Sequence, residues 1–318
     1  MTDPSWRESD LHDRFRDHGL EVPDSVVIPS GDDMAMLRPE AFGDGILIAA
    51  DQVVVGRHVV EDADPEAIGR KAVLRNLSDV AAMAARPVAT VATATLDPTR
   101  SRAWAERLHA GLHRTAREFE APLVGGDLAI HDRPHGPTVV SVTILATPAN
   151  DDGRVLTRRG AKVGDLLAVT GRLGGSLEPG GGGRHLDFPP RVGVGIGLEK
   201  VLGADLHAMI DLSDGLGLDA RRLATASELA IRIDVDRVPI TQGKDWRAAV
   251  EDGEDYELLF ATSAAPPSEI DGVPVTVIGE FIAGSHGRVD LLGLEHPQRI
   301  DGMGWDHTTP RSSGREES

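Results

Sequence analysis

The fold of this chain can be worked outward from the stretch Met209-Ile210-Asp211-Leu212-Ser213-Asp214-Gly215-Leu216-Gly217. An apolar lead-in is followed by two carboxylates and a hydroxyl, and a helix-forming sequence begins after Gly215. This order predicts a junction between a strand and a helix, with Ser213 or Asp214 as the residue that caps the helix.

The chain repeats this placement of acidic residues elsewhere. Apolar segments lead into Gly31-Asp32-Asp33, Ala49-Ala50-Asp51 and Gly125-Gly126-Asp127, and Asp79 lies in Asn76-Leu77-Ser78-Asp79. Because Asp recurs at segment ends or beside glycine, we expect the fold to gather carboxylates. Each motif taken singly also has a simpler interpretation as a turn, a helix cap or, for Asp79, an ion pair with Arg75 four residues earlier.

Composition excludes several classes of function. The length of 318 residues predicts two domains, and 51 acidic against 33 basic residues argue against a nucleic-acid surface. The absence of cysteine excludes disulfides, thiolate catalysis and cysteine-based zinc sites. The N-terminal sequence has no signal-peptide pattern and no apolar run reaches membrane-spanning length. We therefore expect a cytoplasmic protein that binds neither nucleic acid nor membrane.

Hydrophobic periodicity predicts a mixture of helices and strands. Asp64-Pro65-Glu66 is a helix start that combines an N-cap with proline in the first turn, and Pro87 is expected to stop that helix after Ala85. The loop-forming residues of 147–159 mark a boundary between domains at 1–148 and 149–306, followed by a disordered tail at 307–318. The other predicted elements are helices over 5–19, 98–119 and 190–202, strands over 46–50, 53–55, 88–96, 138–145, 165–170, 230–235 and 275–281, and a connection over 23–29.

The motifs, taken in order, resemble the thiamine-monophosphate kinases. Their superfamily also holds aminoimidazole ribonucleotide synthase, selenophosphate synthetase and the hydrogenase-maturation dehydratase. The resemblance covers nearly the whole chain. The matching stretches are Gly31-Asp32-Asp33, Asp51 with Gly56-Arg57-His58, 68–83, Gly125-Gly126-Asp127, Leu156 to Ala161, Thr170-Gly171, Asp211 to Gly215, Gly253 to Leu259, and Gly304-Trp305-Asp306-His307.

The resemblance implies a two-domain α/β (α+β) fold of the aminoimidazole ribonucleotide synthase-like type. In this family the N-terminal domain forms a β-barrel across a homodimer and binds ATP and metal, and the C-terminal domain is α/β. The implied reaction transfers the γ-phosphoryl group of ATP directly onto thiamine monophosphate, giving thiamine diphosphate. The acceptor phosphate has a second pKa of about 6, so no general base is required. Several Mg²⁺ ions are expected to offset the repulsion between the two anions.

The resemblance also implies roles for individual residues. Trp305 suits the cationic thiazolium ring because indole is the best cation–π face, although it can equally be a packing anchor. Arg158 can instead be a surface residue beside Arg154 and Arg159, and His58 a structural histidine. The implied metal ligands are Asp33, Asp51, Asp79, Asp127, Asp211 and Asp214; the nucleotide contacts are Gly126, Arg158 and Ser213; the substrate contacts are His58, Glu254 and Trp305.

Some positions depart from the family pattern. Ala49 and Ala50 stand where hydroxyl residues are usual, and Leu128 follows the aspartate that threonine usually follows. Two alternatives stay open: another ATP-dependent enzyme of the superfamily, or a catalytically silent binder of thiamine phosphate or nucleotide. Selenophosphate synthetase is disfavoured because its reactive cysteine is missing. The sequence leaves undecided the number of metal ions and whether Gly180–Gly183 is a lid or a linker.

Overall fold

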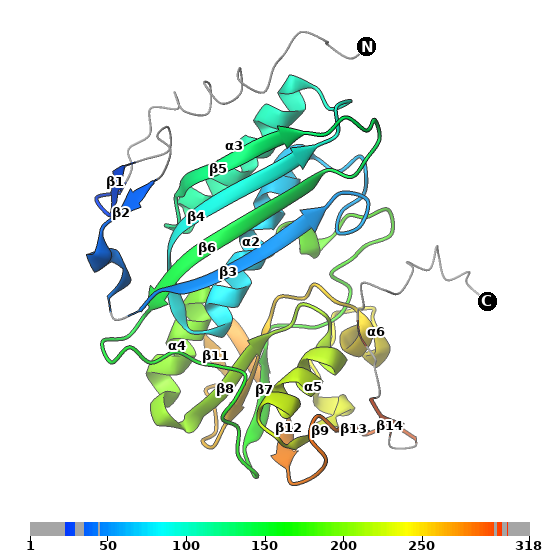
Figure 1. Ribbon diagram of the computed structural model, residues 1–318. Coiled ribbons are helices and arrows are strands. Elements are labelled where there is room, and N and C mark those ends of the chain that lie inside the picture. Colours follow the sequence, from blue (N-terminus) through cyan, green and yellow to red (C-terminus); the bar gives the residue numbers. More distant parts are fainter. Residues whose placement is uncertain (1–22, 29–34, 44, 296–297, 301–303, 305–318) are drawn as a thin grey trace, which may run out of the picture. The chain divides into compact units, whose positions relative to one another are not determined.

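The computed structural model describes residues 23–28, 35–43, 45–295, 298–300 and 304. The chain divides into two compact units (Figure 1). Unit 1 comprises Met1–Thr157 and Leu177–Gly203, and unit 2 comprises Arg158–Ser176 and Ala204–Ser318. The predicted ranges 1–148 and 149–306 place a single division in the chain, whereas the two units alternate along it. None of the described helices has the length and apolar content that a membrane crossing requires.

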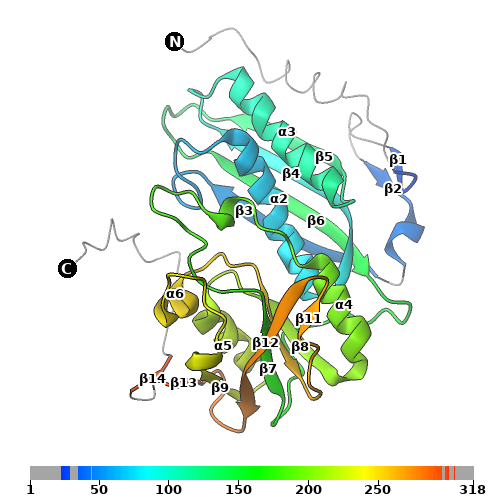
Figure 2. The same cartoon turned by 180° about the vertical axis from the view of Figure 1, so that it is seen from behind.

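Unit 1 is built on a four-stranded sheet with the order β3-β6-β4-β5. Strand β6 pairs antiparallel with β3 and β4, and β4 pairs parallel with β5, so the sheet is mixed. Helices α2 and α3 lie along one face of this sheet (Figure 1, Figure 2). The bounds are β3 Leu47–Val54, β4 Ala85–Leu96, β5 Leu123–Ile130, β6 Val139–Pro148, α2 Pro65–Ala82 and α3 Arg102–Glu118.

Local sequence explains where the two long helices begin. The Asp64 carboxylate accepts a hydrogen bond of 2.8 Å from the Glu66 amide at the start of α2, as predicted. The Ser101 hydroxyl accepts one of 3.2 Å from the Trp104 amide at the start of α3. The prediction that Pro87 stops the helix that begins at Pro65 is wrong. Helix α2 ends at Ala82, and Pro87 lies inside strand β4.

Two acidic motifs predicted at segment ends lie inside strands. Asp51 sits within the continuous strand β3 and pairs with Val142, and Asp127 sits within β5 opposite Thr93. The predicted connection over 23–29 contains a short strand, and the predicted helix 5–19 and tail 307–318 lie outside the described residues. The remaining elements of unit 1 are β1 Val26–Ile28, β2 Met36–Leu37, η1 Pro39–Phe42, η2 Arg184–Leu186 and α4 Val192–Leu202.

Unit 2 contains a sheet of eight strands, with the path β14-β13-β9-β12-β7-β10-β8 and β11 beside β12. Every pairing in it is antiparallel except β13 with β9. The strands are β7 Leu166–Thr170, β8 Leu206–Asp211, β9 Ala230–Asp234, β10 Leu258–Thr262, β11 Glu269–Ile270, β12 Val273–Ile282, β13 Val289–Leu292 and β14 Gln298–Arg299. The helices are η3 Gly203–Asp205, α5 Leu216–Ala226, η4 Val235–Arg237 and α6 Trp246–Glu251.

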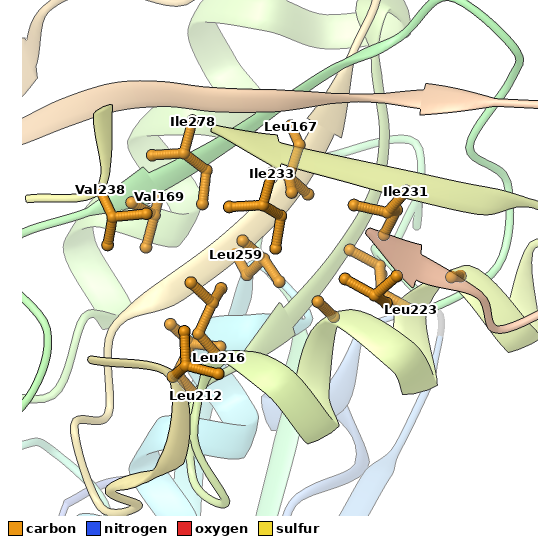
Figure 3. Packing of buried hydrophobic residues seen from close by; sticks show 14 of the residues in the cluster. Leu167, Val169, Leu212, Leu216, Leu223, Ile231, Ile233, Val238, Leu259 and Ile278 are labelled. Atoms are coloured by element: carbon orange, nitrogen blue, oxygen red, sulfur yellow. The ribbon is translucent and has the colours of Figure 1, made fainter. Parts of the chain in front are cut away.

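The core of unit 2 lies between the sheet and helix α5 (Figure 3). Leu216 and Leu223 of α5 are fully buried, as are Ile233 and Leu259 of the sheet. The helix that follows the Asp211–Gly215 stretch is therefore held by aliphatic packing along its length. This packing sets where the acidic loop between β8 and α5 can lie.

Helices α2 and α3 cross so closely that only glycine fits at the contact. A Cβ atom at Gly69 would meet the Leu108 carbonyl and lie 2.7 Å from the Leu112 amide nitrogen. A Cβ atom at Gly111 would meet the Glu66 carbonyl and lie 3.0 Å from the Glu66 Cα. The crossing therefore depends on both glycines.

We expect Gly69→Ala to lower the free energy of unfolding by about 1–3 kcal/mol, because the added methyl group overpacks the helix crossing. Urea denaturation of both proteins measures the change. Gly182→Ala is the matched control, since the nearest atom to its added Cβ, Glu178 Oε2, is 3.7 Å away. Equal losses in the two variants would contradict the close-crossing argument.

Candidate functional site

In unit 1, the first predicted metal ligand is already engaged by an arginine. The Asp51 carboxylate binds Arg75 of helix α2 through two contacts, Nη2 to Oδ1 at 3.1 Å and Nε to Oδ2 at 3.2 Å. The pair ties β3 to α2 and places Asp51 on the helix-facing side of the sheet. A cation at Asp51 therefore has to share or replace these contacts. Asp79 lies four residues further along the same helix.

The Gly125-Gly126-Asp127 motif has a structural reason as well as a possible chemical one. A Cβ atom at Gly126 would collide with the Ala92 carbonyl of the neighbouring parallel strand. Glycine is thus required at this close approach of β4 and β5. Asp127 follows it and is exposed, so its carboxylate is open to a ligand.

Helix α5 is not capped in the predicted way. Its N-cap is Gly215, with φ of 94°, and no side chain of Ser213 or Asp214 makes the capping hydrogen bond. The Asp219 carboxylate instead reaches back and accepts a 2.9 Å hydrogen bond from the Asp214 amide. A Cβ atom at Gly215 would lie 2.9 Å from the Val250 carbonyl oxygen, so a close backbone approach also selects glycine there.

Three carboxylates and one guanidinium meet at this junction. Arg222 Nη1 lies 2.5 Å from Asp214 Oδ2 and 2.6 Å from Asp219 Oδ1, and Asp211 ends strand β8 nearby. Burial raises the pKa of Asp219 to about 7, and the charges of Asp211 and Asp214 act in the same direction. The Asp214 amide and the Arg222 charge oppose that rise in pKa. The carboxylates of Asp211 and Asp214 therefore lie close enough to Asp219 to act on its charge.

Asp219 and Arg222 were not among the predicted site residues. Asp219 is fully buried, whereas an acid in the first turn of a helix ordinarily interacts with the helix dipole at the surface. Arg222 follows it by three residues, which is a spacing that can form an ion pair. This spacing of three residues is the feature of the sequence that could have predicted the ion pair.

The Gly253–Glu257 stretch is joined to the same junction by backbone hydrogen bonds. The Glu254 amide donates to the Ser213 carbonyl at 2.7 Å, and the Tyr256 amide donates to the Leu212 carbonyl at 2.8 Å. In return, the Leu212 amide donates to the Glu257 carbonyl at 2.8 Å. The structure thus brings together Ser213 and Glu254, which the sequence assigned to different ligands.

The turn that carries Glu254 is strained and anchored. Glu254 and Tyr256 have φ of 66° and 52°, a region that non-glycine residues seldom adopt. Between them, the buried Asp255 carboxylate accepts hydrogen bonds from the Gly174 amide at 2.9 Å and the Ser176 hydroxyl at 2.5 Å. These bonds hold the turn in a conformation that its side chains alone disfavour.

The other predicted residues are placed as follows. His58 is buried in the turn after β3, where its Nδ1 accepts a 2.9 Å hydrogen bond from the Val54 amide. Arg158 is exposed at the start of unit 2. Gly304 lies against the junction, because a Cβ atom there would be 2.8 Å from the Asp214 carbonyl oxygen. Asp33 and Trp305 lie outside the described residues.

The donor chemistry of the junction suits a hard cation. No group of three histidine, aspartate or glutamate side chains within the described residues is arranged to hold a metal ion by itself. Mg²⁺ commonly takes one or two carboxylates and completes its shell with water and phosphate oxygens. Asp211 and Asp214 offer such oxygens beside a third carboxylate, that of Asp219, so these residues fit the ion.

Comparisons with known proteins give a consistent family. The model of the N-terminal domain of AIR synthase related proteins matches residues 31–147. Thiamine-monophosphate kinase from Rhodopirellula baltica is 33% identical, with 91% of this chain and 88% of that protein covered.

Solved structures agree with the sequence match. Thiamine-monophosphate kinase from Stenotrophomonas maltophilia is similar with a TM-score of 0.72 and 31% identity, covering 88% of this chain and 95% of that one. AaThiL complexed with AMPPCP and TMP is similar with a TM-score of 0.69 and 26% identity, covering 82% of this chain and 87% of that one. The likeness therefore extends over both units of the chain.

The raised pKa of Asp219 predicts a pH-dependent stability. Its folded pKa of about 7 exceeds the ordinary value of 3.8, so the protonated form favours folding. Its contribution is complete below pH 3.8 and is lost as the pH rises toward 7. In metal-free buffer, we expect Asp219→Asn to gain stability relative to the unchanged protein by roughly 1 kcal/mol per pH unit between pH 4.5 and 7.

Urea denaturation at a series of pH values measures this difference. Glu269→Gln, at an exposed residue of β11, is the control and should follow the unchanged protein at every pH. Parallel stability curves for Asp219→Asn and the unchanged protein would show that Asp219 is ionised throughout.

Proposed function

Since the chain belongs to the thiamine-monophosphate kinase family, we propose that it transfers the γ-phosphoryl group of ATP onto thiamine monophosphate, giving thiamine diphosphate and ADP. The observation that carries the proposal is 33% identity to a kinase of this family over 91% of the chain. The AaThiL complex with AMPPCP and TMP supports the pairing of a nucleotide with a thiamine phosphate as the two substrates.

The backbone pairing at the α5 junction supports a shared role for Ser213 and Glu254. We assign Ser213 to the nucleotide and Glu254 to thiamine monophosphate. Their backbones are joined by a 2.7 Å hydrogen bond, so the two contacts lie on two segments that are held side by side. Fixing both substrates on these two segments lowers the entropy cost of aligning them for in-line transfer. Gly126 and Arg158 are the other proposed nucleotide contacts, with His58 and Trp305 for the thiamine substrate.

No side chain is assigned as a general base. The acceptor is a phosphate with a second pKa of about 6, which is already largely anionic near neutral pH. Mg²⁺, when bound, supplies positive charge that offsets the repulsion between the substrates. The residues we propose to hold it are Asp51, Asp79 and Asp127 of unit 1, Asp211 and Asp214 of unit 2, and Asp33.

The activity is tested by incubating the protein with ATP, Mg²⁺ and thiamine monophosphate and quantifying thiamine diphosphate and ADP. We expect turnover by the unchanged protein and a loss on the order of a hundredfold in kcat for Asp214→Asn, because a charge that serves the transition state is removed. Asp236→Asn, an exposed aspartate of η4, is the control and should keep full activity.

The other outcomes identify the alternatives. Binding of both substrates without any product would indicate a silent binding protein. ADP formation that does not depend on thiamine monophosphate would indicate another ATP-dependent enzyme of the superfamily. Full activity of Asp214→Asn would remove this carboxylate from the proposed metal ligands.

We also propose that the chain forms a homodimer whose N-terminal domains build a β-barrel together. Along β3, Asp51 and the buried Val53 face the helices, so Ile48 and Ala50 face the opposite way. Ile48 is 69% exposed on this strand at the edge of the sheet, and Ile46, just before the strand, is 56% exposed. An exposed apolar edge strand favours pairing with a second copy.

We expect Ile48→Glu to convert the dimer to a monomer, because the substitution buries a charge in the proposed interface. Size-exclusion chromatography with light scattering measures the mass of each species. Val163→Glu changes a residue of unit 2 with a similar exposure of 61% and is the control. A monomeric unchanged protein, or a dimer that survives Ile48→Glu, would contradict this interface.

A further inference from the structure

A buried lysine of helix α2 takes no part in the phosphoryl transfer proposed above. Lys71 is fully buried. Its Nζ lies 3.1 Å from the His58 carbonyl oxygen and 2.6 Å from His185 Nδ1, and His185 is itself 1% exposed. A buried ammonium group is costly unless its donors find acceptors, so these two contacts are structurally important.

The contacts of the pair fit a charged lysine beside a neutral histidine. The Lys71 ammonium group has only hydrogens to donate, so His185 Nδ1 accepts from it. His185 Nε2 then carries the ring proton and donates it to the Gly181 carbonyl oxygen, 3.1 Å away. A charged lysine and a neutral histidine together satisfy every one of these contacts. The network links the turn after β3, helix α2 and the glycine-rich stretch.

The glycine-rich stretch is packed on unit 1. Gly181 has φ of 84°, and a Cβ atom there would collide with the Val60 side chain. The Glu178 amide donates to the Gly182 carbonyl at 2.8 Å, which closes a tight turn. Arg70 Nε binds Asp187 Oδ1 at 2.6 Å, and the neighbouring Phe188 is 1% exposed. Gly181 therefore allows a close approach to Val60, two residues after His58.

We propose that Lys71 is a positioning residue that holds the His58 turn and the stretch 178–187 together as one wall of the thiamine-phosphate site. The inference rests on the proposed function, in which His58 contacts thiamine monophosphate. It answers the question that the sequence left open: Gly180–Gly183 is a fixed wall and neither a lid nor a slack linker. Lys71 acts through the His58 backbone and does not touch the reacting groups.

Lys71→Met keeps the length of the side chain and removes its donors. We expect the KM for thiamine monophosphate to rise about tenfold, the size of effect of one charge-assisted hydrogen bond. The kcat and the KM for ATP should change by less than about twofold, because the transferred group is not misplaced. Lys200→Met, on the exposed side of α4, is the matched control and should leave all three constants unchanged.

A second variant, His185→Asn, tests the inference even if the Lys71→Met protein does not fold. In His185→Asn the amide oxygen can accept from Lys71, but the side chain is too short to reach the Gly181 carbonyl. Hydrogen exchange should then quicken in 178–187 and stay unchanged in 54–60. In folded Lys71→Met it should quicken in both segments.

The outcomes separate this inference from the proposed function. If the unchanged protein forms no thiamine diphosphate, the kinase proposal fails, and hydrogen exchange still tests whether Lys71 and His185 hold the two segments. Unchanged exchange in both variants would overturn the positioning role. An equal rise in KM for both substrates of Lys71→Met would overturn the assignment to the thiamine site.

Discussion

The structure of the candidate site in unit 2 depends on three backbone hydrogen bonds between Leu212–Ser213 and Glu254–Glu257. They join the loop after β8 to the turn before β10, two segments about forty residues apart in the sequence. Strands β8 and β10 are neighbours in the sheet, so the pairing continues past the ends of both strands. The acidic loop is therefore held in place by the same backbone pairing as the sheet and is not an independent surface loop.

Electrostatics gives this rigid loop its chemical character. Asp214 and Asp219 share the guanidinium of Arg222, and the pKa of Asp219 rises because burial and the charges of Asp211 and Asp214 disfavour its ionised form. A cation bound beside these carboxylates would add positive charge to such an arrangement. In unit 1, Asp51 has its charge balanced by Arg75. Among the described residues, Asp51 of unit 1 pairs with Arg75, whereas Asp214 and Asp219 of unit 2 share the guanidinium of Arg222.

Sequence reasoning could predict the order of the elements and part of the site. Helix starts such as Asp64-Pro65-Glu66 carry their own caps, so they depend little on tertiary context. Asp51 and Asp127 were placed at segment ends because alanine and glycine precede them, whereas strand pairing carries β3 and β5 through these positions. Asp219 and Arg222 were signalled only by their spacing of three residues, whereas the role of Lys71 could not be predicted, because it arises from burial and from partners distant in sequence. The alternation of the two units along the chain has the same origin, since the stretch 177–203 packs back onto unit 1.

The alternation of side chains along β3 shows which of the two departures from the family pattern, Ala49 or Ala50, lies near Asp51. Ala49 lies two residues before Asp51 and shares its helix-facing side, whereas Ala50 is exposed and points to the other face. A hydroxyl at position 50 would point away from the Asp51 carboxylate. Within strand β3, therefore, only the hydroxyl missing at Ala49 removes a side-chain donor from the face of Asp51. Asp51, Asp79 and Asp127 remain in place, which favours an active kinase over a silent binding protein.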